Sequence, residues 1–409
     1  MNKFLKEFKD RGFFYQCTGE DELSNLMDKE KINAYIGFDC TAESLHVGSL
    51  LQIMCLRLLQ KHGHKPIVLL GGGTTRIGDP SGKDKTRIIL SENEIEKNIK
   101  NIEKILKNFL DDKDPKTKPI IVNNYSWLKS LNYISFLRDI GKHFTINKML
   151  SFESVKTRLE REQSLSYMEF NYMILQAYDF LELNKKENCT LQVGGSDQWG
   201  NIVNGVDLIK RHSNKQVYGL TTPLITLASG AKMGKTESGA VWLDKKFLSP
   251  YDYWQFWRNI DDRDVLKFLK IFTDLSINEI ENMKDKDINQ LKITLANEAT
   301  SMLHGENEAK ASEETAKKTF TENSFGSELP SITIDENQID KKINIIDLII
   351  LSKLETSKSE IRRLIKGNGV KINNQPILDE KLIITNKLFK DDIIKLSLGK
   401  KRHVKVELS

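Results

Sequence analysis

The sequence has few cysteines and no long hydrophobic run, and each absence excludes a class of protein. Its four cysteines, at positions 17, 40, 55 and 189, are far apart and form no Cys-x-x-Cys pair. We therefore expect reduced, mostly buried thiols, and neither a disulfide framework nor a thiolate zinc finger. No apolar run is long enough for a membrane helix, and the acid-containing N-terminal stretch resembles neither a secretory signal nor a transit peptide. A cytoplasmic location without a membrane segment is the expectation.

Length and charge set further limits. With 409 residues the chain exceeds one ordinary core, and 39% hydrophobic with 29% charged residues is typical of a globular protein. The net charge is only +5, but residues 341–409 contain 16 lysines and arginines against 8 acidic residues. This tail alone carries +8 and the remainder −3, which favours a polyanion as its partner. A solvated lysine-rich surface remains the alternative.

Strand and helix patterns alternate through the first half of the chain. Short apolar runs predict buried strands, and amphipathic segments between them predict helices, one of which begins with a capping box at Ser91 and Glu94. Repeated strand–helix–strand units imply an α/β fold with a parallel sheet covered on both faces. Residues 250–320 give purely helical signals, including a second capping box at Ser276 and Glu279. The expected strands are 33–39, 65–70, 118–124, 191–195 and 218–225.

The stretch "CTAESLHVGSL", residues 40–50, joins the first of these strands to a helix that should end near Gly63. A helix N-terminus at the end of a parallel strand favours an anion, because unpaired backbone N–H groups and the helix dipole point there. His46 and Thr41 can donate hydrogen bonds to phosphate oxygens, and Gly48 has no Cβ to block a flat ring. A lone His-x-Gly is a weak signal and is more often an accident on a helix surface.

A second motif, "KMGKT" at residues 232–236, follows the last expected strand and lies between two glycines. Alone it would indicate an exposed basic loop. Paired with "HVG" on an earlier strand–helix turn, it resembles the signature pair of class I aminoacyl-tRNA synthetases. Together with "GGGTTRIGDPSGKDKTR", "YMILQAYDF" and "VGGSDQWGN", the segments resemble the bacterial-type tyrosyl-tRNA synthetases along nearly the whole chain. The basic tail resembles the S4-like RNA-binding module of that family.

This resemblance implies an organisation into domains. A Rossmann-like catalytic domain with an insertion would occupy residues 1–230, with the insertion as the expected dimer interface. A KMSKS-type mobile loop would follow at 231–247, and an α-helical anticodon-side domain at 248–323. The polar segment 324–340 has no periodicity and is expected to be a linker. The small α+β S4-like domain would then cover 341–409.

The resemblance also implies a two-step reaction. L-tyrosine and ATP would give tyrosyl-adenylate and pyrophosphate, and the tyrosyl group would pass to the 3′-terminal adenosine of tRNA(Tyr). A substrate carboxylate is ionised at neutral pH and needs no general base, so the site has to supply positioning and phosphate donors. The sequence offers such donors but no Ser–His–Asp motif and no metal-ligand spacing. Mg²⁺ should arrive with ATP, and a homodimer is the expected assembly.

Candidate residues for the nucleotide follow from the family pattern. The expected phosphate and pyrophosphate contacts are His46, Thr41, Lys83, Arg87, Lys232, Lys235 and Thr236. The expected ATP and adenylate contacts are Gly37, Asp39, Gly48, Gly194, Gly195, Asp197 and again Lys235. One departure stands at Ser49, where many members of the family have a second histidine. A serine hydroxyl is shorter and never charged, so His46 is expected to carry most of the phosphate role.

The amino-acid pocket can be checked against helix periodicity. Tyr172, Gln176 and Asp179 are spaced i, i+4 and i+7 on an expected helix, so they share one face. In the family pattern Asp79 joins Tyr172 and Gln176 at the substrate ammonium, while Gln198 lies near the carboxylate. Tyr35 and Asp179 would reach the phenolic hydroxyl. A buried carboxylate would then reject phenylalanine, a discrimination for which tyrosyl-tRNA synthetases are themselves the standard example.

The expected tRNA contacts are less specific. Lys210 and Arg211 end an expected helix and could meet the acceptor stem, although cations there stabilise a helix without any RNA. Arg362, Arg363 and Lys366 form a basic helical face in the tail, which favours contact with an RNA backbone by charge and shape, with a plain solvated face as the alternative.

Three other interpretations of the sequence are possible, and its residues argue against each. An RNA-binding scaffold that had lost catalysis would show damage in the ATP loops or the pocket, and Asp79, Lys232 and Lys235 are intact. The related tryptophan enzyme has no use for the polar pair Tyr35 and Asp179, because indole carries no hydroxyl. A dinucleotide fingerprint in "VLLGGGTTRIG" is rejected because the turn formers that follow it do not open a helix.

Overall fold

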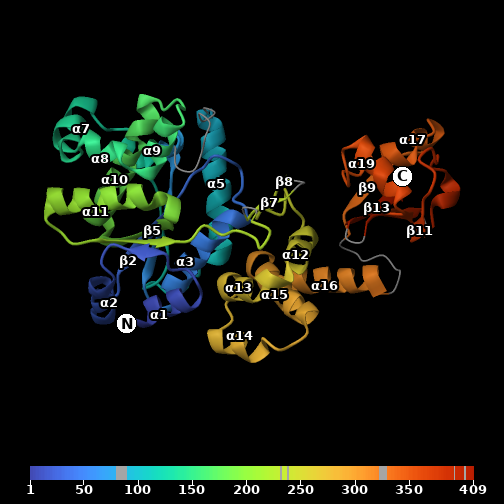
Figure 1. Cartoon of the computed structure of the whole chain (residues 1–409), viewed down its shortest axis with the longest axis horizontal. Coiled ribbons are helices and arrows are strands. Elements are labelled where there is room, and N and C mark those ends of the chain that lie inside the picture. The colour runs from blue at the N-terminus through green and yellow to red at the C-terminus, as the bar shows by residue number, and fades with distance from the viewer. Residues whose placement is uncertain (80–89, 231–232, 237–238, 322–328, 391, 400–401) are drawn as a thin grey trace. The chain divides into compact units, whose positions relative to one another are not determined.

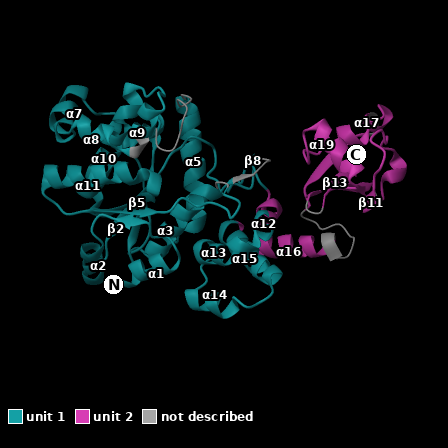
Figure 2. Cartoon of the chain, in the orientation of Figure 1, with its two compact units in different colours: residues 1–248, 256–303 teal, residues 249–255, 304–409 magenta. Residues whose placement is uncertain are grey.

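The computed structural model describes residues 1–79, 90–230, 233–236, 239–321, 329–390, 392–399 and 402–409. The chain divides into two compact units, coloured separately in Figure 2. The first comprises Met1–Leu248 with Phe256–Leu303, and the second comprises Ser249–Gln255 with His304–Ser409. No helix among the described residues is long and apolar enough to cross a membrane.

A six-stranded sheet organises the first unit, in the order β1-β6-β5-β2-β3-β4. The five strands from β6 to β4 are parallel, and only the short edge strand β1 pairs antiparallel, with β6. The predicted α/β fold with a parallel sheet is thereby confirmed. The strands are β1 (Gln16–Cys17), β2 (Asn33–Phe38), β3 (Lys65–Leu70), β4 (Ile120–Asn123), β5 (Cys189–Gly195) and β6 (Tyr218–Thr222).

Helices cover both faces of this sheet, with α10 (Tyr167–Glu187) and α11 (Trp199–Ser213) packed together on one of them (Figure 1). Among the rest, α3 (Leu50–Lys61) follows the 3₁₀ turn η1 (Val47–Ser49). Gly63, with φ of +77°, follows its end as predicted, in a conformation that favours glycine. The others are α1 (Lys3–Asp10), α2 (Glu20–Lys29), α4 (Gly72–Thr75), α5 (Glu92–Phe109), α6 (Tyr125–Leu128), α7 (Tyr133–Asp139), η2 (Gly141–His143), α8 (Ile146–Leu150), α9 (Glu153–Glu160) and η3 (Ser196–Gln198).

Capping boxes fix several helix starts. Those predicted at Ser91 with Glu94 and at Ser276 with Glu279 are present, and a third at Ser166 begins α10. The segment after β6 holds the short strands β7 (Lys235–Thr236) and β8 (Gly239–Ala240). The helical part that follows agrees with the predicted pattern. It consists of α12 (Pro250–Arg258), η4 (Asp262–Asp264), α13 (Val265–Phe272), α14 (Ile277–Met283), α15 (Ile288–His304) and α16 (Glu306–Thr321).

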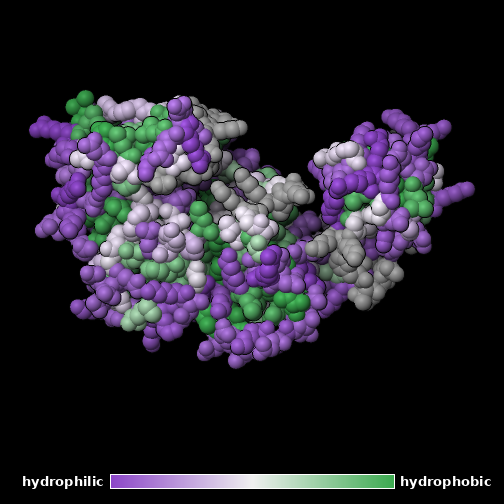
Figure 3. Space-filling view, viewed as in Figure 1, coloured by the Kyte–Doolittle hydropathy of each residue, from purple (hydrophilic) through white to green (hydrophobic). Residues whose placement is uncertain are grey.

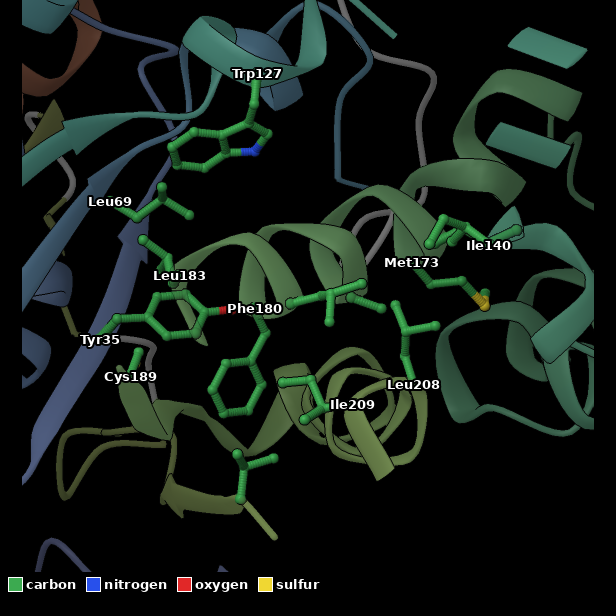
Figure 4. Close-up of a cluster of buried hydrophobic side chains, with 14 of the residues drawn as sticks. Tyr35, Leu69, Trp127, Ile140, Met173, Phe180, Leu183, Cys189, Leu208 and Ile209 are labelled. Atoms are coloured by element: carbon green, nitrogen blue, oxygen red, sulfur yellow. The ribbon is translucent and has the colours of Figure 1, made fainter. Parts of the chain in front are cut away.

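The core beside the sheet centres on α10. Figure 4 shows Tyr35 of β2 beside Phe180 and Leu183 of α10, with Cys189 of β5 close by. The rings of Tyr35 and Phe180 are 5.3 Å apart. All four cysteines are unpaired, and three of them are buried, as the sequence predicts. Because this face of α10 is fixed in the core, the face with Tyr172 and Asp179 has a fixed direction.

The second unit contains a five-stranded sheet in the order β11-β10-β12-β13-β9. It is antiparallel except for β9, which pairs in parallel with β13. Isoleucines, leucines and valines from its strands and from α18 and α19 form a separate core. The elements are β9 (Ser331–Ile334), α17 (Glu336–Asp340), α18 (Ile345–Leu351), α19 (Lys358–Lys366), β10 (Val370–Ile372), β11 (Gln375–Pro376), η5 (Asn386–Leu388), β12 (Ile393–Leu398) and β13 (Arg402–Leu408).

The expected linker 324–340 needs a correction, because it contains β9 and α17. Residues 322–328 lie outside the described part of the chain. The four-residue strand has no strong local pattern, and it forms because β13, much later in the sequence, supplies its hydrogen-bonding partner. The small domain therefore begins at or before Ser331, ten residues earlier than predicted.

This correction predicts how truncations behave. A chain that ends at Asp340 keeps β9 but removes β13, so it exposes an unpaired strand with buried Ile334. A chain that ends at Thr321 removes both. We expect the chain that ends at Asp340 to form more aggregate than the chain that ends at Thr321, as measured by size-exclusion chromatography at equal concentration. Equal solubility of the two would show that β9 is independent of the sheet.

Candidate active site

A cavity of about 520 Å³ opens at the carboxyl ends of β2, β3 and β5. This is the edge of a parallel sheet at which ligands bind. Its walls include every predicted pocket and adenylate residue whose side chain or backbone the structure describes, apart from those in "KMGKT". They are Tyr35, Gly37, Asp39, Thr41, His46, Gly48, Asp79, Tyr172, Gln176, Asp179, Gly194, Gly195, Asp197 and Gln198.

Some predicted residues cannot be placed in this way. Lys83, Arg87 and Lys232 lie outside the described residues. Lys235 and Thr236 form the strand β7, and only their backbone is described. Their expected contacts with pyrophosphate stay predictions.

The carboxylate of Asp179 lies at the inner end of the cavity and is 1% exposed. The indole Nε1 of Trp127 donates to its Oδ1 at 2.7 Å, and the amide of Asn124 donates to its Oδ2 at 2.9 Å. Burial raises the pKa of Asp179 to about 7, while the two donors counteract this shift. Sequence reasoning missed Trp127 and Asn124, because they follow β4, distant in the chain and without a recognisable motif.

The hydroxyl of Tyr35 is buried next to this carboxylate, and no described residue hydrogen-bonds it. Burial first, and then the charge of Asp179, raise the pKa of Tyr35 well above its usual value, so the hydroxyl stays protonated. A buried polar atom without a partner costs about 1–3 kcal/mol. The side-chain oxygen of Gln192, also in the cavity wall, is likewise buried without a hydrogen-bond partner among the described residues. Both atoms are places at which a polar ligand group would be stabilised.

Polar side chains also meet near the η3 side of the cavity. The amide of Gln198 donates to Asp79 at 2.8 Å and accepts from Asn201 at 3.1 Å. The hydroxyl of Tyr172 donates to Asp39 at 3.4 Å. This arrangement directs two carboxylates and an amide into the same space, which suits a cationic ammonium group.

The contacts at the start of η1 explain why the sequence has a histidine and a glycine there. His46 is the N-cap of η1, and its Nδ1 accepts the backbone N–H of Gly48 at 2.9 Å. The neutral ring must then carry its proton on Nε2, the tautomer that can donate to a phosphate. A Cβ on Gly48 would lie 2.6 Å from Cε1 of His46 and 3.1 Å from the carbonyl oxygen of Met233. The imidazole of His46 therefore needs the space beside Gly48. The expected role of this glycine, room for a flat ring, stays a prediction.

The two signature motifs lie together. Val47 donates its N–H to the carbonyl of Val241, and Leu243 donates to Leu45, both at 2.9 Å. Gly234 has φ of +91°, and a Cβ there would lie 2.8 Å from the nitrogen of Gly48. The described part of "KMGKT" is thus packed against "HVG", as the pairing of motifs in the sequence suggested.

The expected RNA-contacting residues lie elsewhere. Lys210 and Arg211 are exposed at the end of α11, and Arg211 donates to the carbonyl of His143 at 2.6 Å. In the second unit Arg362, Arg363 and Lys366 are exposed on α19. Arg363 pairs with Glu360 at 2.7 Å, a surface interaction that contributes little to stability and leaves a basic face.

The fold and this site match a known class of enzyme. The family described as "tRNA synthetases class I (W and Y)" matches residues 27–321. The "Tyrosine--tRNA ligase SYY-like C-terminal domain" matches residues 320–406. The first match covers the parallel sheet and the cavity, and the second covers β9 to most of β13.

Individual proteins narrow the class. The tyrosine–tRNA ligase of Pelagibacter ubique is 83% identical over 408 residues, covering all of both chains. That of Rickettsia rickettsii is 53% identical over 410 residues, covering 99% of this chain and all of the other. The chain belongs to the tyrosine–tRNA ligase family of class I synthetases, and the resemblance stated from the sequence is confirmed.

Solved structures agree. A C-terminally truncated mitochondrial tyrosyl-tRNA synthetase of Aspergillus nidulans is 31% identical, with a TM-score of 0.70 over 78% of this chain and 94% of the other. A tyrosyl-tRNA synthetase of Archaeoglobus fulgidus, solved with L-tyrosine, is 17% identical with a TM-score of 0.56 over 76% and 99%, and it supports the fold alone.

The raised pKa of Asp179 predicts how activity depends on pH. Below about 7 the carboxyl of the empty pocket gains a proton and accepts hydrogen bonds less well. We expect kcat/KM for tyrosine in pyrophosphate exchange to fall by up to about tenfold for each pH unit below this value and to level off above it. Asp179→Asn should lower kcat/KM and flatten the profile. An unchanged profile in this variant would assign the titration to another group.

Proposed function

We propose that the chain activates L-tyrosine with ATP and then transfers the tyrosyl group to the 3′-terminal adenosine of tRNA(Tyr). The observation that carries this proposal is the buried pair at the end of the cavity. Asp179 offers a carboxylate, and Tyr35 offers a hydroxyl without a partner. A phenol can donate to the first and accept from the second. Phenylalanine would leave the hydroxyl of Tyr35 without a partner and would give Asp179 no further donor. The indole of tryptophan has no oxygen to accept from Tyr35.

The other end of the cavity suits the nucleotide. With the phenol at Asp179, the substrate ammonium would meet Asp79, Tyr172 and Gln176, and Gln198 would lie beside the carboxylate. The carboxylate would then point toward the helix mouth, where His46 and Thr41 can donate to the α-phosphate. Charge that grows on phosphate oxygens in the transition state is stabilised by donors already held in place, and His46 is held by its bond to Gly48.

The ATP loops would complete the site. Lys83, Arg87, Lys232, Lys235 and Thr236 are the proposed contacts of the departing pyrophosphate. Asp39, Asp197 and the glycines at 37, 48, 194 and 195 are the proposed adenylate contacts. Mg²⁺ is proposed to enter with ATP. Among the residues that the structure describes, no cluster of three or more His, Cys, Asp or Glu side chains is placed to hold a metal ion.

The basic tail, residues 341–409, is the proposed tRNA-binding module, with Arg362, Arg363 and Lys366 at its phosphate-contacting face. Lys210 and Arg211 are the proposed contacts of the acceptor stem. The cytoplasm is the proposed location, because the substrates ATP and tRNA are there.

We also propose a homodimer, formed through the insertion between β4 and β5. Eight large apolar side chains of this insertion are exposed, Ile134 by 71% and Ile146 by 59%. Figure 3 shows hydrophobic residues on the surface over α7 and α8. A cluster of this kind on one segment is typical of an interface. This apolar patch consists of Tyr133, Ile134, Leu137, Ile146, Leu150, Leu159, Tyr167 and Met168.

Pyrophosphate exchange with separate amino acids tests the function. We expect ATP-dependent exchange with tyrosine and far less with tryptophan or phenylalanine. Tyr35→Phe removes only the hydroxyl, so it should weaken tyrosine binding by about tenfold. The difference in exchange rate between tyrosine and phenylalanine should therefore become smaller in this variant. No exchange with tyrosine, in a preparation that binds tRNA, would leave the chain as an RNA-binding protein and refute the proposal.

Charge in the apolar patch tests the dimer. Ile134→Glu would place a carboxylate in the proposed interface, which is costly when it has no partner. We expect this variant to sediment as a monomer at micromolar concentration while the wild type sediments as a dimer. Leu378→Glu is the matched control, because Leu378 is 72% exposed but lies in the second unit. A monomeric wild type, or a dimeric Ile134→Glu, would contradict the interface.

A further inference from the structure

The glycine-rich turn "GGGTTR" after β3 takes no part in the reaction proposed above, yet it contacts two segments that carry site residues. The hydroxyl of Thr75 accepts the N–H of Cys40 at 2.9 Å, which holds the strand that leads to His46. Gly73 donates its N–H to the Oδ1 of Asn124 at 2.7 Å, and Thr74 accepts from the Nδ2 of Asn124 at 2.9 Å. The same Nδ2 donates to Asp179.

The turn is the four-residue helix α4, where the sequence predicts only a glycine loop. The backbone of α4 packs closely against the end of β4 and against α6, with no room for a side chain at two of its glycines. A Cβ on Gly72 would lie 2.3 Å from Oδ1 of Asn123, and a Cβ on Gly73 would lie 2.7 Å from Cδ1 of Leu128. A single helical turn has little stability of its own, so other contacts must hold α4 against Asn124.

Arg76, at the C-terminal end of α4, supplies such contacts. Its guanidinium carbon lies 3.7 Å from the centre of the Tyr125 ring. Its Nε and Nη2 donate to the two carboxylate oxygens of Glu92, at 3.1 and 3.0 Å. Nη1 donates to the carbonyl of Gly72 at the start of the same turn. One side chain, only 19% exposed, thus joins α4 to α5 and α6.

Tyr125 is the residue next to Asn124, so the stacked ring fixes the backbone that carries this amide. The amide of Asn124 is fully buried and has three hydrogen bonds, two to α4 and one to Asp179. A shift of α4 relative to α6 would break the first two and turn the third away from the carboxylate.

We propose that Arg76, stacked on Tyr125, is a positioning residue that orients Asn124 and, through it, the carboxylate of Asp179 that recognises the substrate phenol. This inference rests on the proposed function. Arg76 acts through other side chains and is not among the residues that line the cavity. Its loss should therefore affect the amino acid more than the nucleotide.

The test measures exchange kinetics of Arg76→Met and Tyr125→Leu in the full chain. Both should raise KM for tyrosine by about tenfold, with KM for ATP and kcat within about twofold. Arg76→Lys keeps a charge but loses the fork to Glu92, so it should give an intermediate value. Tyr125→Phe keeps the ring and should match the wild type. Arg263→Met, at a surface arginine paired with Asp261, is the control for removal of an arginine.

A second readout separates positioning from mere stability. With Asn124 displaced, the ionised form of Asp179 loses a donor, so the acid limb of kcat/KM for tyrosine should move to higher pH in Arg76→Met. Folded Arg76→Met with wild-type KM and an unmoved limb would overturn the inference. So would a lower melting temperature with less active protein but an unchanged KM.

Two safeguards keep the test decisive. If Arg76→Met does not fold, the comparison of Tyr125→Leu with Tyr125→Phe decides, because the two differ in whether the ring is present. Failure of the wild type to exchange with tyrosine would refute the proposed function itself. The inference about Arg76 fails only when the wild type is active and the variants bind tyrosine equally well.

Discussion

The structure depends on one interaction, the pair of hydrogen bonds that Asn124 and Trp127 donate to the buried carboxylate of Asp179. Asp179 is brought to these two donors by α10, which Phe180 and Met173 on an adjacent face hold in the core. Burial favours the protonated acid, and the donors Asn124 and Trp127 favour the charged form. The balance leaves the pKa of Asp179 at about 7, so the proposed phenolic donor would favour the ionised carboxylate. Much of the surrounding architecture, from β4 to α6, serves to supply those two donors.

The start of η1 determines the tautomer of His46. A histidine such as His46 can be charged or neutral, and the neutral ring can carry its proton on either nitrogen. The bond from Gly48 to Nδ1 removes one of these freedoms, because it requires a lone pair on that nitrogen. A protonated ring would lose this cap. The glycine is therefore part of the histidine's geometry, and the described part of "KMGKT" packs on both.

Sequence patterns predicted the parts of the site that lie on one regular element. Tyr172, Gln176 and Asp179 share a face of α10 because helix periodicity requires it, and His46 stands where a strand becomes a helix. The patterns could not predict Asn124, Trp127 or Arg76. Asn124 and Trp127 contact the carboxylate directly from the segment that follows β4, and Arg76 contacts α5 and α6 from the end of α4. No spacing in the sequence indicates which of these turns will meet. β9 was missed for the same reason, since its partner is β13.

That pairing of β9 with β13 has a consequence for how the protein is made. In the second sheet β9 is translated first among the strands, yet its only neighbour, β13, is translated last among them. During synthesis β9 therefore stays unpaired until the ribosome has translated the chain as far as β13. The first unit has no such delay at that stage, because all its strands have already been translated. The first unit can thus fold while the tail is still being synthesised, and the second unit completes its sheet last.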